Sequence, residues 1–131
     1  MGDLLAKGSE MLDRTRRAHL SRTVVYRRGV DSVEIEATVG STAFDRTDEY
    51  GVVHRIESRD YLVAAADLVL GGEAVTPKAG DRITETAEAR VHEYEVMSSG
   101  SLGRDEPAWR YSDPQRRTLR IHTKFVRTGA A

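Results

Sequence analysis

The residues best suited to chemistry in this sequence are its histidines. His19, His54, His92 and His122 stand far apart along the chain, so a metal site would have to be assembled by the fold without any local ligand motif. His92 and His122 fall in stretches with strand-like alternation, where a histidine is ordinarily a surface or half-buried residue. The histidine spacing therefore predicts no metal site.

Closely spaced carboxylates offer acid–base chemistry in principle. Glu34 with Glu36, and Glu93 with Glu95, each share one face of a strand-like stretch. Exposed strand faces are commonly charged, and the acidic run at 45–49 lacks the spacing of a calcium loop. P-loop, G-x-S-x-G, H-E-x-x-H and G-x-G-x-x-G motifs are missing from the sequence. We therefore expect no enzyme activity and no catalytic, cofactor or metal site; an unrecognised hydrolase built on His92, His122, Glu93 and Glu95 is the least favoured alternative.

Basic residues gather toward the two ends of the chain. Residues 1–30 carry a net charge of +4, residues 31–106 carry −10 and residues 107–131 carry +5. Such unequal blocks create complementary patches if folding keeps like charges together. With Tyr26, Tyr94, Trp109 and Tyr111, the basic ends leave open a small-barrel binder of single-stranded nucleic acid. The pI of about 6.4, and aromatic residues that are not interleaved with the basic ones, make that hypothesis less favoured.

The elements that position these residues are predicted from length and periodicity. The 131 residues are typical of a single domain, which buries roughly two thirds of the surface of its unfolded chain. The chain has no cysteine, so disulfides and thiolate metal sites are excluded and a reducing compartment is its natural setting. We expect neither a cleaved export signal nor a membrane span, since the start lacks an apolar signal core and no window approaches 18 apolar residues.

The apolar pattern changes from a helical period to a strand period near residue 21. Apolar residues three and four apart predict one amphipathic α-helix over residues 3–20. Thereafter alternation predicts strands. In VEIEATV, residues 33, 35, 37 and 39 share an apolar face, and in LRIHTKF, Leu119, Ile121, Thr123 and Phe125 face inward, opposite Arg120, His122 and Lys124. Further strands are predicted at 23–28, 52–56, 61–65, 81–86 and 91–97. The expected fold is mostly β, a small β-barrel or sandwich over 23–127 with an N-terminal α-helix and long loops.

Two stretches interrupt the alternation. Residues 42–58 are polar and charged, which predicts either a long loop or a protruding hairpin. Residues 98–116 combine glycines, two prolines and the single tryptophan, which predicts a long connection anchored by Trp109. Long loops in a domain of this size are usually functional or disordered.

Two stretches of the sequence, taken together, suggest a family. The first, RDYLVAAADLVLGGEAVTPKAGDRITE, leads through a P-x-x-G-D-R-I turn into a strand and is followed by Y-x-V at Tyr94–Val96. The second is WRYSDPQRRTLRIHTKFV, from Trp109 to Val126. In their order, these stretches resemble the small head-to-tail joining proteins of tailed bacteriophages and prophages, also called head-completion, stopper or neck proteins. The resemblance covers roughly residues 23–127.

The resemblance implies a structural protein of the virion neck, made in the cytoplasm of the bacterial host. Such a protein forms a homo-oligomeric ring between the portal–adaptor complex of the capsid and the tail, has no membrane partner, and helps to retain packaged double-stranded DNA, which it touches without sequence specificity. The projecting stretch 42–58 is the match for a loop that enters the channel of the ring, and the residues expected near its tip are Asp45, Arg46, Asp48, Glu49 and Tyr50. In the P-x-x-G-D motif, Pro77, Gly80 and Asp81 need only a turn-forming role.

A ring requires that one surface of each subunit meets a different surface of the next. We expect these contacts to involve basic and aromatic residues near the two ends of the chain, namely Arg14, Arg17, Trp109, Tyr111, Arg116 and Arg117. Within the same assembly, a tail terminator or a minor tail subunit is the alternative. The single-stranded nucleic-acid binder is the alternative of a different class.

Overall fold

The computed structural model of the chain describes residues 21–97 and 107–130, and the regular structure of these residues is almost entirely β. The predicted helix over 3–20 lies outside the described residues. Within them no α-helix occurs, and no helix is long and apolar enough to cross a membrane. The elements are β1 (Ser21–Arg28), β2 (Asp31–Thr47), β3 (Val53–Ala64), the 3-10 turn η1 (Ala65–Asp67), β4 (Val69–Leu70), β5 (Glu73–Ala74), β6 (Arg82–Ala87), β7 (Arg90–Val96), β8 (Trp109–Tyr111) and β9 (Thr118–Ala130).

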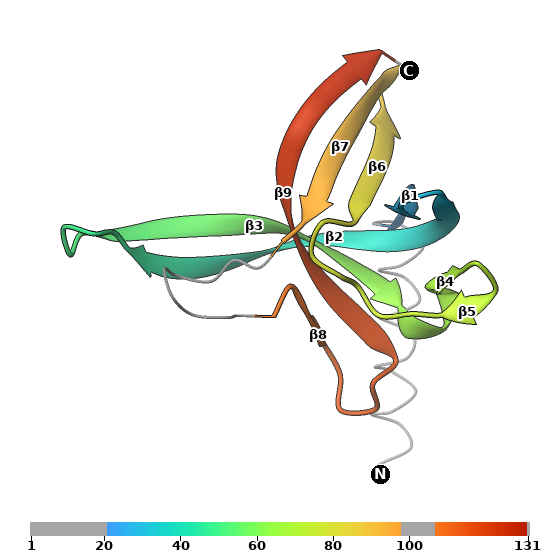
Figure 1. The fold of residues 1–131 in the computed structure, drawn as a ribbon, viewed down its shortest axis with the longest axis horizontal. Helices are drawn as coiled ribbons and strands as arrows, with labels where there is room; N and C mark the ends of the chain where they lie inside the picture. The colour runs from blue at the N-terminus through green and yellow to red at the C-terminus, as the bar shows by residue number, and fades with distance from the viewer. Residues whose placement is uncertain (1–20, 98–106, 131) are drawn as a thin grey trace, which may run out of the picture.

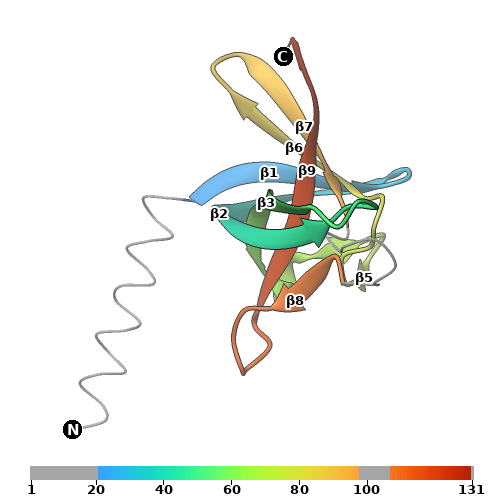
Figure 2. The same ribbon diagram turned by 90° about the vertical axis from the view of Figure 1, so that its left-hand side faces the viewer.

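Hydrogen bonding closes six of the strands into a ring. The order β3-β2-β1-β6-β7-β9 is antiparallel throughout, and an additional pairing between β3 and β9 joins its two ends. β8 attaches to β9, and β4 with β5 forms a separate two-stranded sheet. β9 runs through nearly the full height of the molecule in both views (Figures 1 and 2). Because β9 pairs with β3, β7 and β8, it is the strand on which the closure depends.

The core fills the inside of this ring with side chains from alternate strand positions. In β2, Ile35 and Ala37 are buried while Val33 and Val39 pack against the core, which confirms the alternation predicted for VEIEATV. A fully buried apolar side chain of this size contributes about 1.5–3 kcal/mol to stability. The other buried apolar residues are Val24, Tyr26, Tyr61, Val63, Leu68, Leu70, Ile83, Val96, Ala108, Leu119 and Ile121.

Several predicted boundaries were wrong. The strands expected at 52–56 and 61–65 are one continuous strand, β3, because its polar first half pairs with β2 along its whole length. Trp109–Tyr111, expected inside a long connection, forms β8 beside β9. Residues 42–58 form the two strands and the turn of a hairpin, which is one of the two forms that the sequence left open.

Phe125 was predicted to face the core, and it is not buried there. Leu119, Ile121 and Thr123 are buried as expected, but Phe125 is 56% exposed. Tyr94 pairs with Phe125 and Glu93 pairs with Arg127, so Val126 is an extra residue in β9. Such a bulge locally disrupts the ladder and bends the strand. The rings of Phe125 and Tyr94 still meet edge-to-face, with their centroids 5.8 Å apart. This contact lies outside the core.

Two arms extend from the ring and diverge (Figure 1). Pairing of β1 with β2 ends at Thr38 and pairing of β3 with β9 begins at Arg59, so residues 39–47 and 53–58 continue outward as a two-stranded ribbon closed by the turn 48–52. We call this ribbon the hairpin arm. The three-strand arm consists of β6, β7 and residues 124–130 of β9, which lie beyond the pairing of β9 with β3.

Candidate functional site

The hairpin arm ends in a turn that its own side chains shape. Asp48 Oδ1 accepts hydrogen bonds from the backbone N–H groups of Tyr50 and Val52, both at 2.9 Å, and Gly51 adopts a φ of +80°. His54 Nε2 lies 2.8 Å from Asp48 Oδ2, and this contact is the main reason why the pKa of Asp48 lies below its usual value. Asp48 therefore acts first as a turn-forming residue, as aspartate commonly does.

The structure brings the residues predicted for the channel loop to the end of this arm. Tyr50 is 83% exposed, and Asp45 and Glu49 are exposed. The backbone of Arg46 pairs with His54, while its side chain lies outside the described part of the structure. Val52, the last residue of the turn, and Val53, the first residue of β3, are also exposed; neither was predicted as a channel residue. Together with Tyr50 they give the tip an apolar surface next to its carboxylates.

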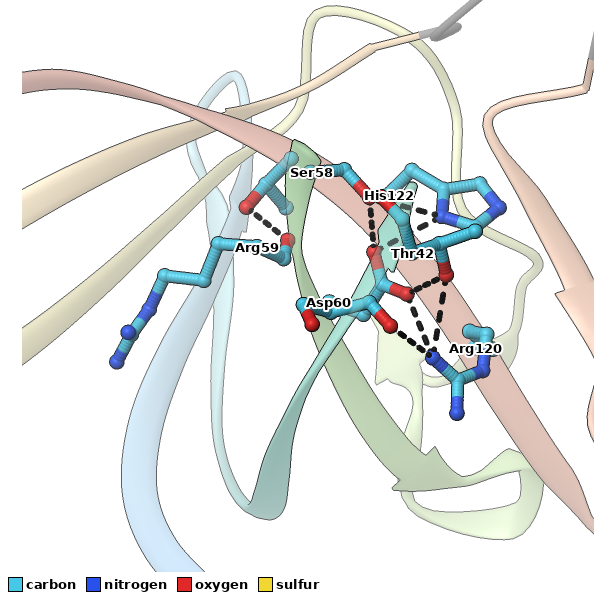
Figure 3. A network of polar contacts seen from close by, with 8 residues as sticks. Thr42, Ser58, Arg59, Asp60, Arg120 and His122 are labelled. Atoms are coloured by element: carbon cyan, nitrogen blue, oxygen red, sulfur yellow. Dashed lines mark hydrogen bonds and ion pairs between the residues drawn. The ribbon is translucent and has the colours of Figure 1, made fainter. Parts of the chain in front are cut away.

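A buried polar network lies at the base of the hairpin arm, where β2, β3 and β9 meet. Asp60 on β3 has no exposed surface, and Figure 3 shows side chains from three strands converging on its carboxylate. Arg120 Nη1 donates to Oδ2 at 2.6 Å, and His122 Nδ1 lies 2.9 Å from Oδ1. The hydroxyls of Thr42 and Ser58 donate to the same carboxylate. These contacts link β2 and β9 to β3 at the position where the arm leaves the ring.

The charge on Asp60 is stabilised by this arrangement. Burial alone would raise the pKa of Asp60, but hydrogen bonds from His122, Ser58, Thr42 and Arg120 outweigh burial and hold its pKa below the usual range. A buried carboxylate with this many donors is fully satisfied and costs much to disrupt. The His122 ring also meets Phe44 edge-to-face at 5.3 Å, so an aromatic contact covers part of the network.

Ser58, His122 and Asp60 are the residue types of a nucleophilic triad, but their contacts differ from one. In a triad the carboxylate binds one ring nitrogen and the serine faces the other. Here the Ser58 hydroxyl donates to Asp60 and lies 3.5 Å from His122 Nδ1, the same nitrogen that contacts Asp60. All three side chains are buried. The arrangement positions strands and leaves no nucleophile open to a substrate.

A second buried carboxylate joins the two arms inside the ring. Glu85 on β6 accepts from Arg59 Nη2 at 2.7 Å and from the Tyr61 hydroxyl at 2.8 Å, and it also pairs with Arg22 on β1. Arg59 stacks over the ring of Tyr94 at 4.9 Å. Burial opposes the charge of Glu85, yet hydrogen bonds from Arg22 and Arg59 hold its pKa below the usual value. The network connects the base of the hairpin arm to the three-strand arm.

Replacing Glu85 should therefore destabilise the fold strongly. Glu85→Ala leaves Arg59 half-buried without its anion, and we expect a loss of about 3–5 kcal/mol in the free energy of unfolding. Urea denaturation followed by tyrosine and tryptophan fluorescence measures this loss. The matched control is Glu34→Ala, on the exposed face of β2, which should change stability by less than about 0.5 kcal/mol. Equal effects of the two substitutions would contradict the proposed role of Glu85.

Comparison with protein families identifies the chain. The family model of the phage head-tail joining proteins matches residues 2–130. The chain belongs to this family. Comparison with curated proteins and with solved structures gave no match. The match confirms the family predicted from the two sequence stretches, and it places this head-tail joining protein at the junction of head and tail in the virion, in contact with head and tail proteins.

The family is structural and is not an enzyme family, which confirms the expectation that the head-tail joining protein is not an enzyme. The carboxylates considered for hydrolysis lie in cross-strand ion pairs: Glu93 binds Arg127 at 2.8 Å, and Glu95 lies 3.6 Å from Lys124. His92 Nδ1 lies 2.9 Å from the Thr128 hydroxyl. Within residues 21–97 and 107–130, three or more potential metal ligands gather at no point.

The aromatic residues considered for nucleic-acid binding are not gathered on one face of the head-tail joining protein. Tyr26 is fully buried, where its hydroxyl donates to Asp81, which also accepts from Arg28 Nη2 at 2.8 Å. Tyr94 packs between Tyr61 and Phe125. Asp81 of the P-x-x-G-D motif thus anchors β1, beyond the turn-forming role that was expected for it.

The predicted subunit-contact residues fall into two groups. Arg14 and Arg17 lie outside the described residues. Trp109 packs against the core and meets Tyr111 edge-to-face at 5.1 Å, and Arg116 stacks over Tyr111 at 5.7 Å. The Arg117 carbonyl accepts a hydrogen bond from the Ala65 N–H at 2.8 Å. Tyr111 borders a cleft of about 630 Å³ whose lining is Arg28, Ala65, Ala74, Val75, Thr76, Pro77, Lys78, Tyr111 and Leu119.

Proposed function

We propose that copies of this head-tail joining protein form a ring in the neck of the virion, and that this ring passes the packaged DNA and helps to retain it. The observation that carries the proposal is the hairpin arm of a chain that belongs to the head-tail joining family. The arm extends well beyond the ring of strands and carries an exposed turn (Figure 1). An element of this shape can reach into a channel that the rest of the subunit lines.

The charge of the tip favours obstruction over binding as the means of retention. Residues 45–50 include three carboxylates and one arginine, so the tip has the same sign as the DNA backbone. Proteins that hold DNA through its phosphates present lysine and arginine. In the proposal, the tips of several subunits narrow the channel while their carboxylates keep contact with DNA weak and independent of sequence. DNA then passes during packaging and is retained by the reduced width of the channel.

The proposed subunit contacts use surfaces that lie apart on the molecule. β4 and β5 lie away from the hairpin arm, at the other end of the long axis (Figure 1). The cleft beside Tyr111 is lined in part by Ala74 of β5. In a ring of identical subunits, one surface of each subunit contacts a different surface of the next. The group formed by Trp109, Tyr111 and Arg116 stays in the proposal as one side of the subunit interface.

Shortening the hairpin arm should impair the retention of DNA without impairing the joining of heads to tails. Thr47 and Val53 are paired, so replacing residues 48–52 by Asn-Gly gives a two-residue hairpin turn without changing the register. We expect particles of normal shape whose heads lose DNA, measured as the nuclease-protected DNA per particle together with the fraction of filled heads in electron micrographs.

The matched control is Val30→Ala in the fully exposed turn between β1 and β2. This variant should retain DNA normally. Full retention by particles that carry the shortened arm would exclude a channel role for Asp48, Glu49 and Tyr50, which this variant lacks, while leaving the joining role in place.

A further inference from the structure

Two strand edges in the described residues have no neighbouring strand. β1 pairs with β2 only as far as Thr38, so residues 39–47 of β2 are unpaired on that side. β3 pairs with β9 only as far as Thr123, so residues 124–130 of β9 are unpaired on their β3 side. Free edges of this length present rows of backbone donors and acceptors, and proteins usually protect them. Neither segment contains the proline that often gives this protection.

Among the described residues, no strand of the same chain fills the β9 edge. Arg59 pairs with Thr123, so extending the same register outward would set Arg55 of β3 opposite Arg127 of β9. Like charges directly opposite each other destabilise a strand pair. The two arms instead diverge at this point (Figure 1), which leaves the β9 edge open.

Side chains leave this edge accessible. Arg127 Nε binds Glu93 at 2.8 Å and Lys124 Nζ lies 3.6 Å from Glu95, so both cations lean toward β7, on the opposite side of β9 from the free edge. Phe125 and Val126 are exposed beside the edge. Exposed apolar side chains next to unpaired backbone groups are the features that strand addition uses for recognition.

We propose that the free β2 edge of one copy, residues 39–47, pairs antiparallel with the free β9 edge of the next copy, residues 124–130. The inference rests on the proposed ring and specifies one contact between its subunits, in addition to the contact proposed for Trp109, Tyr111 and Arg116. Charge selects the orientation: antiparallel pairing brings Asp45 to the Lys124 end of β9, whereas parallel pairing would bring Asp45 toward Ala130. Residues 124–130 carry two cations and no carboxylate. Lys124 lies 3.6 Å from Glu95 but its side chain is 55% exposed, so it can also meet an acidic neighbour.

This pairing has the symmetry that a ring needs. Each copy supplies one β2 edge and accepts through one β9 edge, so the interface joins unlike surfaces and propagates around the ring. The turn 48–52, which contains Asp48, Glu49 and Tyr50, lies beyond the paired residues and remains available for the channel, whereas Asp45 and Arg46 then belong to the subunit interface. With Asp45 opposite Lys124, Ala43 faces Val126, the bulged residue of β9 that has no partner in β7. Residues that face each other in an antiparallel pair lie within the range that a disulfide spans.

Cysteine cross-linking tests the pairing, because the natural chain contains no cysteine. Particles are assembled with the double variant Ala43→Cys/Val126→Cys, oxidised and analysed by gel electrophoresis without reductant. We expect a ladder of covalent multimers of this chain. Mixed assembly of the two single variants should give a linked pair containing one of each. The control pairs Ala43→Cys with Val30→Cys, whose side chain is fully exposed but lies in the turn between β1 and β2, and should give no ladder.

Three outcomes would overturn the inference: no ladder from assembled particles, an equal ladder from the control, or cross-links to a head or tail protein in place of a second copy. Hydrogen exchange gives an independent measurement, since the amides of residues 39–47 and 124–130 should become protected on assembly. The proposed ring is tested separately by imaging the necks of the same particles. A ring without the Ala43–Val126 cross-link refutes only the edge pairing, whereas the absence of a ring refutes the proposed function.

Discussion

Particles assembled without this chain should yield separate heads and tails in place of joined virions. The expectation follows from membership of the head-tail joining family, whose role is to connect the two structures. With the connecting protein missing, each part completes its own assembly but lacks the surface that binds the other. Negative-stain imaging should show free tails and unattached heads, either filled or leaking, and the count of joined particles should fall to background.

Supplying the chain from a plasmid should restore joining, and Val30→Ala should restore it as well as the natural sequence does, because the Val30 side chain makes no buried contact. Normal joined particles in the absence of the chain would contradict the joining role. Tails of uncontrolled length would point instead to tail termination, since the defect would then lie in finishing the tail before the head arrives.

Asp60→Ala should be among the most destabilising single substitutions in the described part of the chain. Removing the carboxylate leaves Arg120 and His122 without their buried partner, and breaking a buried pair in this way typically costs about 3–5 kcal/mol. Against a total stability of roughly 5–15 kcal/mol for a domain of this kind, that loss is severe. Urea denaturation measures it, with Asp67→Ala in the exposed η1 turn as the control.

Acid should remove the contribution of Asp60 selectively. Its pKa in the folded state lies below the ordinary value of 3.8, so the unfolded state takes up a proton first as the pH falls. The stabilisation is therefore complete above about pH 4 and is lost progressively below it. The difference in unfolding free energy between the natural chain and Asp60→Asn should shrink over that range. A difference that stays constant down to pH 2 would contradict the proposed state of Asp60; because Asp60→Asn keeps the side-chain volume, it provides the test even if Asp60→Ala does not fold.

Local pattern predicted much of the scaffold but little of its polar interior. The alternation in residues 33–39 is a local signal, and it correctly predicted a strand there. The bulge that exposes Phe125 comes from the register between β7 and β9, which no local pattern contains. Likewise the polar alternation through 53–57 is typical of a loop or a surface ribbon, and only pairing with β2 decides between them.

The buried polar networks could not be predicted from the sequence, for a related reason. Ser58 and Asp60 occupy one face of β3 opposite the apolar face of Tyr61 and Val63, and such a polar face is ordinarily solvated. It is buried here because Arg120 and His122, sixty residues away, lie on the adjacent strand. The sequence signal for this burial was limited to Ser58 and Asp60, the polar residues that directly precede the apolar end of β3. The polar pattern of residues 42–58 predicted a long loop or a protruding hairpin, and the family resemblance added the channel role. The structure decides in favour of the hairpin.

The continuity of β9 also matters for the mechanical behaviour of the neck. β9 holds the three-strand arm through β7 and the base of the hairpin arm through β3, along a single uninterrupted backbone. Tension between head and tail that entered the subunit through these two arms would therefore act along the axis of β9. When force acts along the strands, many hydrogen bonds must break together, whereas force across the strands breaks them one at a time. The pairing of β9 with both β3 and β7 should therefore resist shear between the two arms.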